Sequence, residues 1–210
     1  MIRVLIADDH ALIREGLTKI FGREPDIEVV AEAKDANEAI AWSRANDYDV
    51  AIIDVNMPGP SGLDALQHIL SDKPTLPVLM LSVLPERNFA VRMLRAGAAG
   101  FVSKESAADE IVEAVRRVAS GKKYVSPTAA DSLAMELARG SQAEPHTFLS
   151  NREFQVLRMI ASGRGTRVMA EELKLSVNTI ATYRRRILKK LELASDVELT
   201  RYALEHKLLD

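Results

Sequence analysis

Five polar residues that lie far apart in the sequence could together form a site for phosphate and a metal ion: Asp8, Asp9, Asp54, Ser82 and Lys104. Each of them stands at the end of a short apolar run or just after one. Clustered carboxylates repel one another unless a hard cation lies among them, and oxygen ligands with room for water and phosphate suit Mg²⁺. A carboxylate in such a site can attack a phosphoryl group, while a lysine and a hydroxyl stabilise the phosphoryl oxygens.

The apolar runs before these residues are predicted to be buried strands, because they are too short for helices and rich in β-branched side chains. Between residues 3 and 120 they alternate with amphipathic stretches, which predicts an α/β domain with a doubly wound, five-stranded parallel sheet. In flavodoxin-like sheets of this kind the strand order is 2-1-3-4-5, and ligands bind beyond the carboxyl ends of the strands. The expected strands cover residues 3–7, 28–33, 50–54, 77–82 and 100–103, and the expected helices cover residues 11–21, 36–46, 61–70, 86–96 and 107–120.

The overall composition fits an ordinary water-soluble protein with more than one core. The chain has 210 residues, of which 47% are hydrophobic, and a net charge of −2. It has no cysteine, so neither disulfides nor thiolate metal sites are possible. The first residues run directly into an apolar strand and reach Asp8 too soon for a signal-peptide core or a membrane span. We therefore expect a cytoplasmic protein with no membrane partner.

The charges are distributed unevenly along the chain. Residues 148–210 contain 12 lysine and arginine residues against 8 acidic ones, a balance of +4, whereas residues 1–147 contain 16 against 22, a balance of −6. A small basic domain attached to an acidic one suggests that the basic part binds a polyanion. We expect a first domain over residues 1–122, a linker with a short helix around 129–139 over residues 123–147, and a second domain over residues 148–210.

The second domain is predicted to be a small all-α helix-turn-helix domain. Ser150 and Glu153 have the spacing of a capping box, with Leu149 placed to contact Phe154, so a helix is expected to begin there. Apolar residues then recur at helical spacing in four segments. A three-residue turn before Ser176 joins two short helices, the later of which is dense in arginine and lysine.

Taken singly, each residue of the acidic set has an ordinary structural explanation. An aspartate after a strand is most often a turn residue or a helix N-cap, and aspartates before a helix favour its dipole. A lone serine or lysine is usually structural or solvated. The combination is different, because these residues occur together at the ends of the first, third, fourth and fifth predicted strands.

Residues 1–122 resemble the receiver domain of response regulators. The resemblance implies that a sensor histidine kinase phosphorylates Asp54. It also implies that Mg²⁺ is held by Asp9, Asp54 and the main-chain carbonyl of Asn56, with Asp8 assisting through water. Val83 departs from the family pattern, since alanine or glycine is more usual there, and its bulk would restrict access to Asp54. The positions that carry the resemblance are Asp8, Asp9, Asp54, Met57, Pro58, Gly62, Ser82, Phe101 and Lys104, among which Ser82 and Phe101 are implied to be the switch pair and Lys104 to contact the phosphoryl group.

Residues 148–210 resemble the LuxR-type helix-turn-helix of the NarL/FixJ subfamily. The matching segments are Leu149–Glu153, Ala170–Leu173, Leu175–Ser176, Thr179–Ile180, Ile187 and Lys190–Leu191. In a recognition helix over Val177–Leu191, helical spacing turns Ile180, Ile187 and Leu191 inward. The side chains expected to face DNA bases are those of Asn178, Ala181, Thr182 and Arg185, and those expected to contact phosphates are Thr179, Arg184, Arg186, Lys189 and Lys190.

Several positions of the second domain depart from the subfamily pattern. Ala181 and Tyr183 stand where lysine and histidine are common, so a different operator sequence is expected. Glu192 and Lys207 stand where a helix-ending glycine is common. The last helix, Asp196–His206, carries apolar side chains that could pack on a second copy of the chain.

The interpretation that follows is a DNA-binding transcriptional response regulator that is not an enzyme. Its expected partners are a sensor histidine kinase, double-stranded promoter DNA, RNA polymerase and, when phosphorylated or on DNA, a second copy of the chain. One alternative is a Mg²⁺-dependent phosphatase with Asp54 as nucleophile, but Asn56 stands where such enzymes usually have a second acid. Another is a DNA-binding regulator whose first domain is a docking module that works without phosphorylation.

Overall fold

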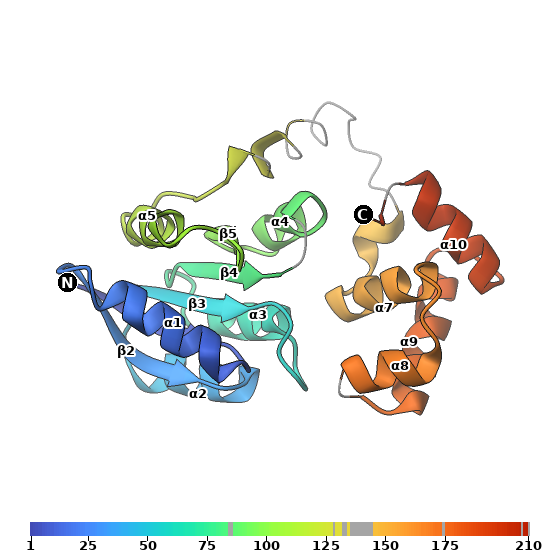
Figure 1. Ribbon diagram of the computed structural model, residues 1–210, viewed down its shortest axis with the longest axis horizontal. Coiled ribbons are helices and arrows are strands. Elements are labelled where there is room, and N and C mark those ends of the chain that lie inside the picture. Colours follow the sequence, from blue (N-terminus) through green and yellow to red (C-terminus); the bar gives the residue numbers. More distant parts are fainter. Residues whose placement is uncertain are drawn as a thin grey trace. The chain divides into compact units, whose positions relative to one another are not determined.

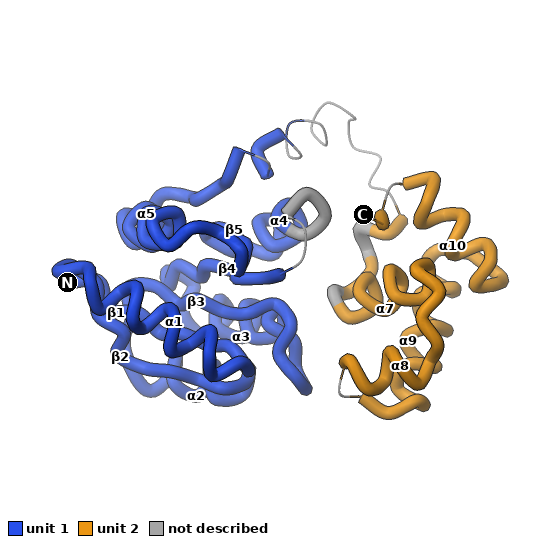
Figure 2. The backbone as a smooth tube through the Cα atoms, in the orientation of Figure 1, with its two compact units in different colours: residues 1–140 blue, residues 141–210 orange. Residues whose placement is uncertain are grey.

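The computed structural model describes residues 1–83, 86–127, 129–131, 134, 145–173, 175–206 and 208–209, without the side chains of residues 86–89, 147, 148 and 151. Contacts within the chain divide it into two compact units, residues 1–140 and 141–210 (Figure 2). Most of the short helix expected around residues 129–139 lies outside the described residues. Within the described part of the chain, no helix combines the length and the apolar character needed to cross a membrane.

The first unit is built on one five-stranded parallel sheet with the order β2-β1-β3-β4-β5 (Figure 1). This confirms the predicted doubly wound architecture and its strand order. The strands occupy the predicted segments to within one residue at either end, and the central strands β3 and β4 are buried along their whole length. They are β1 (Ile2–Ala7), β2 (Ile27–Ala33), β3 (Val50–Asp54), β4 (Val78–Ser82) and β5 (Gly100–Ser103).

Helices follow each strand and cover both faces of the sheet (Figure 1). Helices α1 and α5 contact each other, and helices α2 and α3 contact each other. Strand residues alternate between the two faces, so one core combines residues such as Ile6, Ile52 and Leu81 with Phe21 of α1 and Val115 of α5. The helices are α1 (Ala11–Phe21), α2 (Ala36–Ala45), α3 (Gly62–Asp72), α4 (Glu86–Arg95) and α5 (Ala108–Ala119).

The two edges of the sheet are not plain strands. At one edge, the pairing of β2 with β1 shifts register between Val4 and Leu5, which leaves Val30 as an extra residue in β2. At the other edge, Tyr124 forms an isolated parallel bridge with Gly100 of β5. The segment that follows α5 therefore covers part of the β5 edge.

The second unit consists of η1 (Pro145–Phe148), a 3₁₀ turn, and of helices α7 (Asn151–Ala161), α8 (Thr166–Glu172), α9 (Val177–Lys190) and α10 (Asp196–Glu205). The predicted capping box is present, since the Ser150 hydroxyl accepts from the Glu153 N–H and the Glu153 carboxylate accepts from the Ser150 N–H. Ser176 likewise caps α9 by accepting from the Thr179 N–H. Helix α9 contacts both α7 and α8, and α10 contacts α7.

The end of α9 has an unusual backbone conformation. The Leu193 N–H donates to the Leu188 carbonyl in the last turn of α9. Glu192, which directly precedes Leu193, has φ of +56°. Equivalent helix ends at α5 and α7 use Gly121 and Gly163 with positive φ. Because a side chain in this left-handed region meets the following carbonyl, Glu192 places strain where glycine would be relaxed.

Candidate functional site

The parallel register brings the ends of four strands to one edge of the sheet. Ala7 pairs with Ile53, so Asp8 and Asp54 are the next residues on neighbouring strands. Ser82, the last residue of β4, pairs with Ser103, and Lys104 directly follows. Residues from the ends of β1, β3, β4 and β5 thus gather as the sequence predicted from strand order.

Three carboxylates and one ammonium group form the centre of this site. The Lys104 Nζ lies 2.6 Å from the Asp8 Oδ2 and 3.1 Å from the Asp54 Oδ2. Asp8 and Asp54 are buried, with exposed fractions of 0% and 1%. Carboxylate oxygens of Asp8, Asp9 and Asp54 and a ring nitrogen of His10 all lie within 4.8 Å of one another. One lysine cannot balance three carboxylates, so the site has an excess of negative charge.

This environment changes the acidity of Asp54. Burial raises its pKa from 3.8 to about 6, although the nearby Lys104 ammonium acts in the opposite direction and Asp8 adds to the rise. A carboxylate with a raised pKa is held in a costly charged state at neutral pH. Any cation that enters the site relieves that cost.

The residues present fit a hard divalent cation. The buried Asp8 Oδ2 and Asp54 Oδ2 both face the Lys104 ammonium, and one ammonium group cannot satisfy two buried carboxylates and the adjacent Asp9. Oxygen donors from three carboxylates match the preference of Mg²⁺, and the half-buried Asn56 lies two residues beyond Asp54.

A close backbone approach explains why a glycine begins α3. A Cβ atom on Gly62 would lie 1.9 Å from the Asp54 carbonyl oxygen. The Gly62 N–H donates to the Val55 carbonyl at 3.1 Å, which fastens the start of α3 to the end of β3. Any side chain at this position would displace the backbone that carries Asp54.

The sequence interpretation missed His10. The ring Nδ1 of His10 lies 3.1 Å from the Asp8 Oδ1 and 2.9 Å from the Asp9 Oδ1. The main-chain N–H of His10 donates to the Asp8 Oδ1. The signal was available, because His10 directly follows the aspartate pair and precedes α1. Two further predicted residues are buried: Ser82 at the end of β4 and Phe101 within β5, with exposed fractions of 0% and 1%.

Helix α9 presents a buried face and an exposed face. Ile180 and Ile187 are fully buried, and Leu191, which caps the helix, is 6% exposed. Four side chains expected to face bases are exposed on the other side: Asn178, Ala181, Thr182 and Arg185. The Thr182 hydroxyl donates to the Asn178 carbonyl of the same helix at 3.0 Å.

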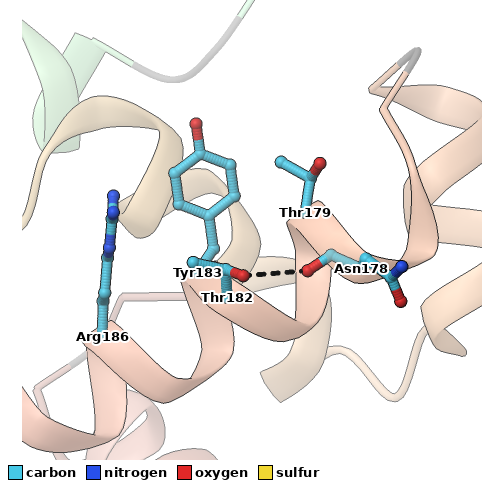
Figure 3. A pocket seen from close by; sticks show the side chains of 5 residues that line it. All are labelled: Asn178, Thr179, Thr182, Tyr183 and Arg186. Atoms are coloured by element: carbon cyan, nitrogen blue, oxygen red, sulfur yellow. Dashed lines mark hydrogen bonds between the residues drawn. The ribbon is translucent and has the colours of Figure 1, made fainter.

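A shallow groove of about 320 Å³ lies along α9 (Figure 3). In Figure 3 the Thr179, Tyr183 and Arg186 side chains extend from the same side of the helix. A polar groove with an exposed arginine suits a phosphate group or a base edge better than an apolar ligand. Its lining residues are Asn178, Thr179, Thr182, Tyr183 and Arg186.

Some of the residues expected to contact DNA phosphates already have partners within the second unit. The Arg184 Nε lies 2.6 Å from an Asp196 carboxylate oxygen, and the Lys190 Nζ lies 2.6 Å from the Glu153 Oε2. Glu153 is buried, and although burial alone would raise its pKa, hydrogen bonds from Lys190 and Ser150 hold that pKa below its usual value. The Thr179 hydroxyl pairs with the Ser176 hydroxyl at 2.8 Å.

Comparison with known families assigns both units. Residues 4–116 match the response regulator receiver domain, and residues 147–203 match the luxR family of bacterial regulatory proteins. Curated relatives match over the full chain. Response regulator UvrY of Escherichia coli O6:H1 is 39% identical over 99% of this chain and 96% of its own length, and response regulator GacA of Pseudomonas protegens is 38% identical over 100% and 99%.

Solved structures are similar to this chain over nearly its whole length or over about two thirds of it. RcsB of Salmonella enterica serovar Typhimurium, bound to promoter rprA in the presence of the phosphomimetic BeF₃⁻, is 25% identical and covers 96% of this chain and 98% of its own, with a TM-score of 0.62. A LuxR-family two-component response regulator from Aurantimonas sp. SI85-9A1 is 34% identical over 66% of this chain and 99% of its own, with a TM-score of 0.62. The chain belongs to the two-component response regulators of the NarL/FixJ family, with an N-terminal receiver domain and a C-terminal LuxR-type DNA-binding domain.

Proposed function

We propose that the chain is a phosphorylation-controlled transcription factor in which Asp54 accepts a phosphoryl group from a sensor histidine kinase. One observation carries the proposal: Asp54 is a buried carboxylate at the end of the central strand, with the Lys104 ammonium 3.1 Å away and two further aspartates beside it. The raised pKa of Asp54 leaves it ionised at neutral pH but poorly stabilised, which favours its use as a nucleophile.

In the proposed step, an Asp54 carboxylate oxygen forms a bond to phosphorus while the bond from phosphorus to the kinase histidine nitrogen breaks. The histidine leaves as neutral imidazole after it takes up a proton. Lys104 stabilises the negative charge of the phosphoryl oxygens, and the Ser82 hydroxyl donates a hydrogen bond to one of them.

A magnesium ion would supply charge neutralisation for the three carboxylates and the phosphoryl oxygens. The residues proposed to hold it are Asp9, Asp54 and the main-chain carbonyl of Asn56, with Asp8 assisting through water. The charge excess and the buried carboxylate oxygens of Asp8 and Asp54 support this assignment. Ser82 and Phe101 are proposed to act as the pair that senses the phosphoryl group.

The second domain is proposed to bind promoter DNA through α9. Asn178, Ala181, Thr182 and Arg185 are proposed to face bases, and their exposure on one side of the helix supports this role. Arg185 could pair with a guanine through two hydrogen bonds. The proposed phosphate contacts are Thr179, Arg184, Arg186, Lys189 and Lys190.

Phosphorylation is proposed to favour a homodimer that binds paired half-sites. Val197 and Leu204 of α10, which are 79% and 61% exposed, could contribute to such an interface. RNA polymerase is the proposed downstream partner, and the cytoplasm the proposed location. The proposal includes no catalytic activity on a separate substrate. We retain residues 1–122, 123–147 and 148–210 as the proposed receiver, linker and DNA-binding domain.

The first test is intact mass of the purified protein after incubation with Mg²⁺ and acetyl phosphate. We expect a gain of one phosphoryl group that is lost in the Asp54→Asn variant, together with a change from monomer to dimer in light scattering. Equal uptake by the variant would remove Asp54 from its role. No uptake by the wild type, combined with intact DNA binding, would favour a docking module that works without phosphorylation.

The DNA contacts are tested on a duplex selected from a random-sequence pool by the wild-type protein. Replacing Arg185 with alanine should weaken binding to this duplex by about 1–3 kcal/mol and relax selectivity at one position. Replacing Lys189 with alanine should weaken binding to selected and random duplexes alike. If both variants behave identically on both duplexes, the proposed division between base and phosphate contacts is wrong.

A further inference from the structure

The start of the proposed linker is fastened to the receiver domain. The Tyr124 N–H donates to the Ala99 carbonyl at 2.9 Å, and the Tyr124 hydroxyl donates to the Glu110 carboxylate at 2.9 Å. The Lys123 ammonium donates to the Ala98 carbonyl at 2.7 Å. Tyr124 is only 8% exposed, so the contact is a packed one. We call residues 122–126, which include these contacts, the strap.

The fit between the strap and β5 leaves no free space. A Cβ atom on Gly100 would lie 2.8 Å from the Tyr124 carbonyl oxygen and 2.9 Å from the Tyr124 Cβ. Distances below 3 Å between such atoms require one of them to move. The position of the strap therefore depends on the position of β5 at this point.

The same strand carries a residue of the acidic site at its other end. Gly100 begins β5, and Lys104 follows its last residue. At about 3.3 Å per residue, these two positions are about 13 Å apart along one strand. The Lys104 N–H also donates to the Ser82 carbonyl at 2.8 Å, so the ends of β4 and β5 are tied together next to Asp54.

A phosphoryl group on Asp54 must change the contacts of Lys104. The Lys104 ammonium contacts the carboxylates of both Asp8 and Asp54, and a phosphoryl group attracts an ammonium group strongly. Because Lys104 directly follows β5, a shift of Lys104 toward the phosphoryl group pulls on β5. The tight contact at Gly100 passes that displacement to Tyr124.

We propose that the strap is a phosphorylation-sensitive clasp: it holds the start of the linker against β5 while Asp54 is a free carboxylate, and it loosens when Asp54 is phosphorylated. A loosened strap lengthens the free part of the linker and lets the DNA-binding domain engage DNA. Tyr124 and Lys123 are then positioning residues that couple the two domains. This inference rests on the proposed phosphorylation of Asp54.

Adjacent lysines provide a matched pair of variants. Lys122 and Lys123 are both exposed, but among the described contacts only the Lys123 ammonium binds carbonyl groups of the receiver. Lys123→Ala removes the hydrogen bonds of its ammonium group to the Gly97 and Ala98 carbonyls, and Tyr124→Phe removes the hydrogen bond to Glu110. Both variants leave the bond from the Tyr124 N–H to the Ala99 carbonyl in place. Lys122→Ala is the control for the loss of a positive charge in this segment.

The measured quantity is the ratio of DNA affinities with and without acetyl phosphate, on the duplex selected by the wild-type protein. We expect Lys123→Ala and Tyr124→Phe to raise the affinity of the unphosphorylated protein, which lowers this ratio by about fivefold or more. Phosphoryl uptake by intact mass and the affinity of the phosphorylated form should stay at wild-type values. Lys122→Ala should keep the wild-type ratio.

Hydrogen exchange of the strap provides an independent measurement on the unmodified chain. The Tyr124 amide should exchange faster after incubation with Mg²⁺ and acetyl phosphate in the wild type, and should not change in Asp54→Asn. Normal phosphoryl uptake with unchanged Tyr124 exchange would overturn the clasp and leave the proposed function intact. An unchanged affinity ratio in both strap variants would overturn it as well. Failure of the wild type to take up phosphate would instead contradict the proposed function and, with it, this inference.

Discussion

The receiver domain and the DNA-binding domain use charge in opposite ways. The receiver buries two carboxylates beside one lysine, with exposed fractions of 0% and 1% for Asp8 and Asp54, and Asp9 lies next to them. The second domain leaves most of its basic side chains on the surface, and two of those on α9 form pairs with acidic residues of their own domain. Burial of a charged group costs free energy, and one added charge nearby changes that cost strongly. An exposed charge costs little, and its removal changes stability only slightly.

The comparison shows where single substitutions should have large effects. In the acidic site, the charges of Lys104 and Asp8 act on the ionisation of the buried Asp54, so removal of either one should change the pKa of Asp54. On the exposed face of α9, solvent screens each charge, and the position of a residue relative to DNA decides its effect. The pair between Lys190 and Glu153 is the exception, because Glu153 is 4% exposed even though Lys190 is not buried.

The largest predicted effect is a gain of stability when the nucleophile is neutralised. The rise in the pKa of Asp54 from 3.8 to about 6 corresponds to about 3 kcal/mol of destabilisation at pH 7. Asp54→Asn should therefore stabilise the receiver in buffer without Mg²⁺, as measured by urea unfolding. Because the folded state binds the proton more tightly, the wild type should become more stable relative to the variant as pH falls from 7 through 6 toward 4.

Magnesium is the control for that experiment. Added Mg²⁺ should stabilise the wild type and reduce the advantage of Asp54→Asn, since the cation neutralises the same charge. A variant that is less stable than the wild type without Mg²⁺ would show that Lys104 already balances Asp54.

The next effect distinguishes two basic residues of the same helix. Lys190→Ala removes the cation that contacts the buried Glu153 carboxylate and should destabilise the second domain by about 1–2 kcal/mol. Arg184→Ala breaks an exposed pair with Asp196 and should change stability by less than about 0.5 kcal/mol. If thermal unfolding shows the same loss of stability in both variants, burial of Glu153 does not strengthen its ion pair.

A smaller effect should appear at acid pH. Hydrogen bonds from Lys190 and Ser150 hold the pKa of Glu153 below its usual value of 4.5, despite the opposing effect of burial. A carboxylate with a lowered pKa stabilises the folded state above its unfolded pKa, and that contribution is lost as pH falls through the folded value. The melting temperature of the Glu153→Gln variant should therefore decrease less than that of the wild type between pH 6 and pH 3.5. A parallel decline in both proteins would contradict this assignment.

The smallest effect concerns the end of α9. Glu192→Gly relieves the left-handed conformation at φ of +56° and should stabilise the second domain by roughly 0.5–1 kcal/mol. Glu192→Ala keeps a side chain in the same conformation and serves as the control, with no comparable gain. Chemical unfolding of the two variants measures the difference.

Much of the receiver fold could be predicted from the sequence, because buried parallel strands consist of short apolar runs rich in β-branched residues, and such runs can be recognised directly. The ends of β1, β3, β4 and β5 could be found from those runs, and the residues at these ends form one cluster. His10 was missed because the prediction considered only the residues at the ends of apolar runs, although its place directly after the aspartate pair was a signal. The close approach at Gly62 depends on the path of the backbone after β3, which residue types alone do not reveal.

The second domain was predictable in its helices but less so in its surface. The capping residues Ser150 and Ser176 and the apolar spacing marked the helices correctly. The charge density of α9 suggested that all of its basic residues face DNA. The pairing of Lys190 with Glu153 depends on how α9 packs against α7, and that of Arg184 with Asp196 depends on where α10 begins, and no local pattern in α9 indicates either one.

The bridge between Gly100 and Tyr124 also affects how the receiver behaves in isolation. Strand β5 is the last of the sheet, and an uncovered edge strand can pair with another chain and start aggregation. The opposite edge, β2, is interrupted by its extra residue at Val30, which discourages such pairing. A receiver fragment that ends at Lys122 would therefore expose the edge of β5. A fragment that ends at Ser126 would keep this edge covered and should aggregate less at high concentration.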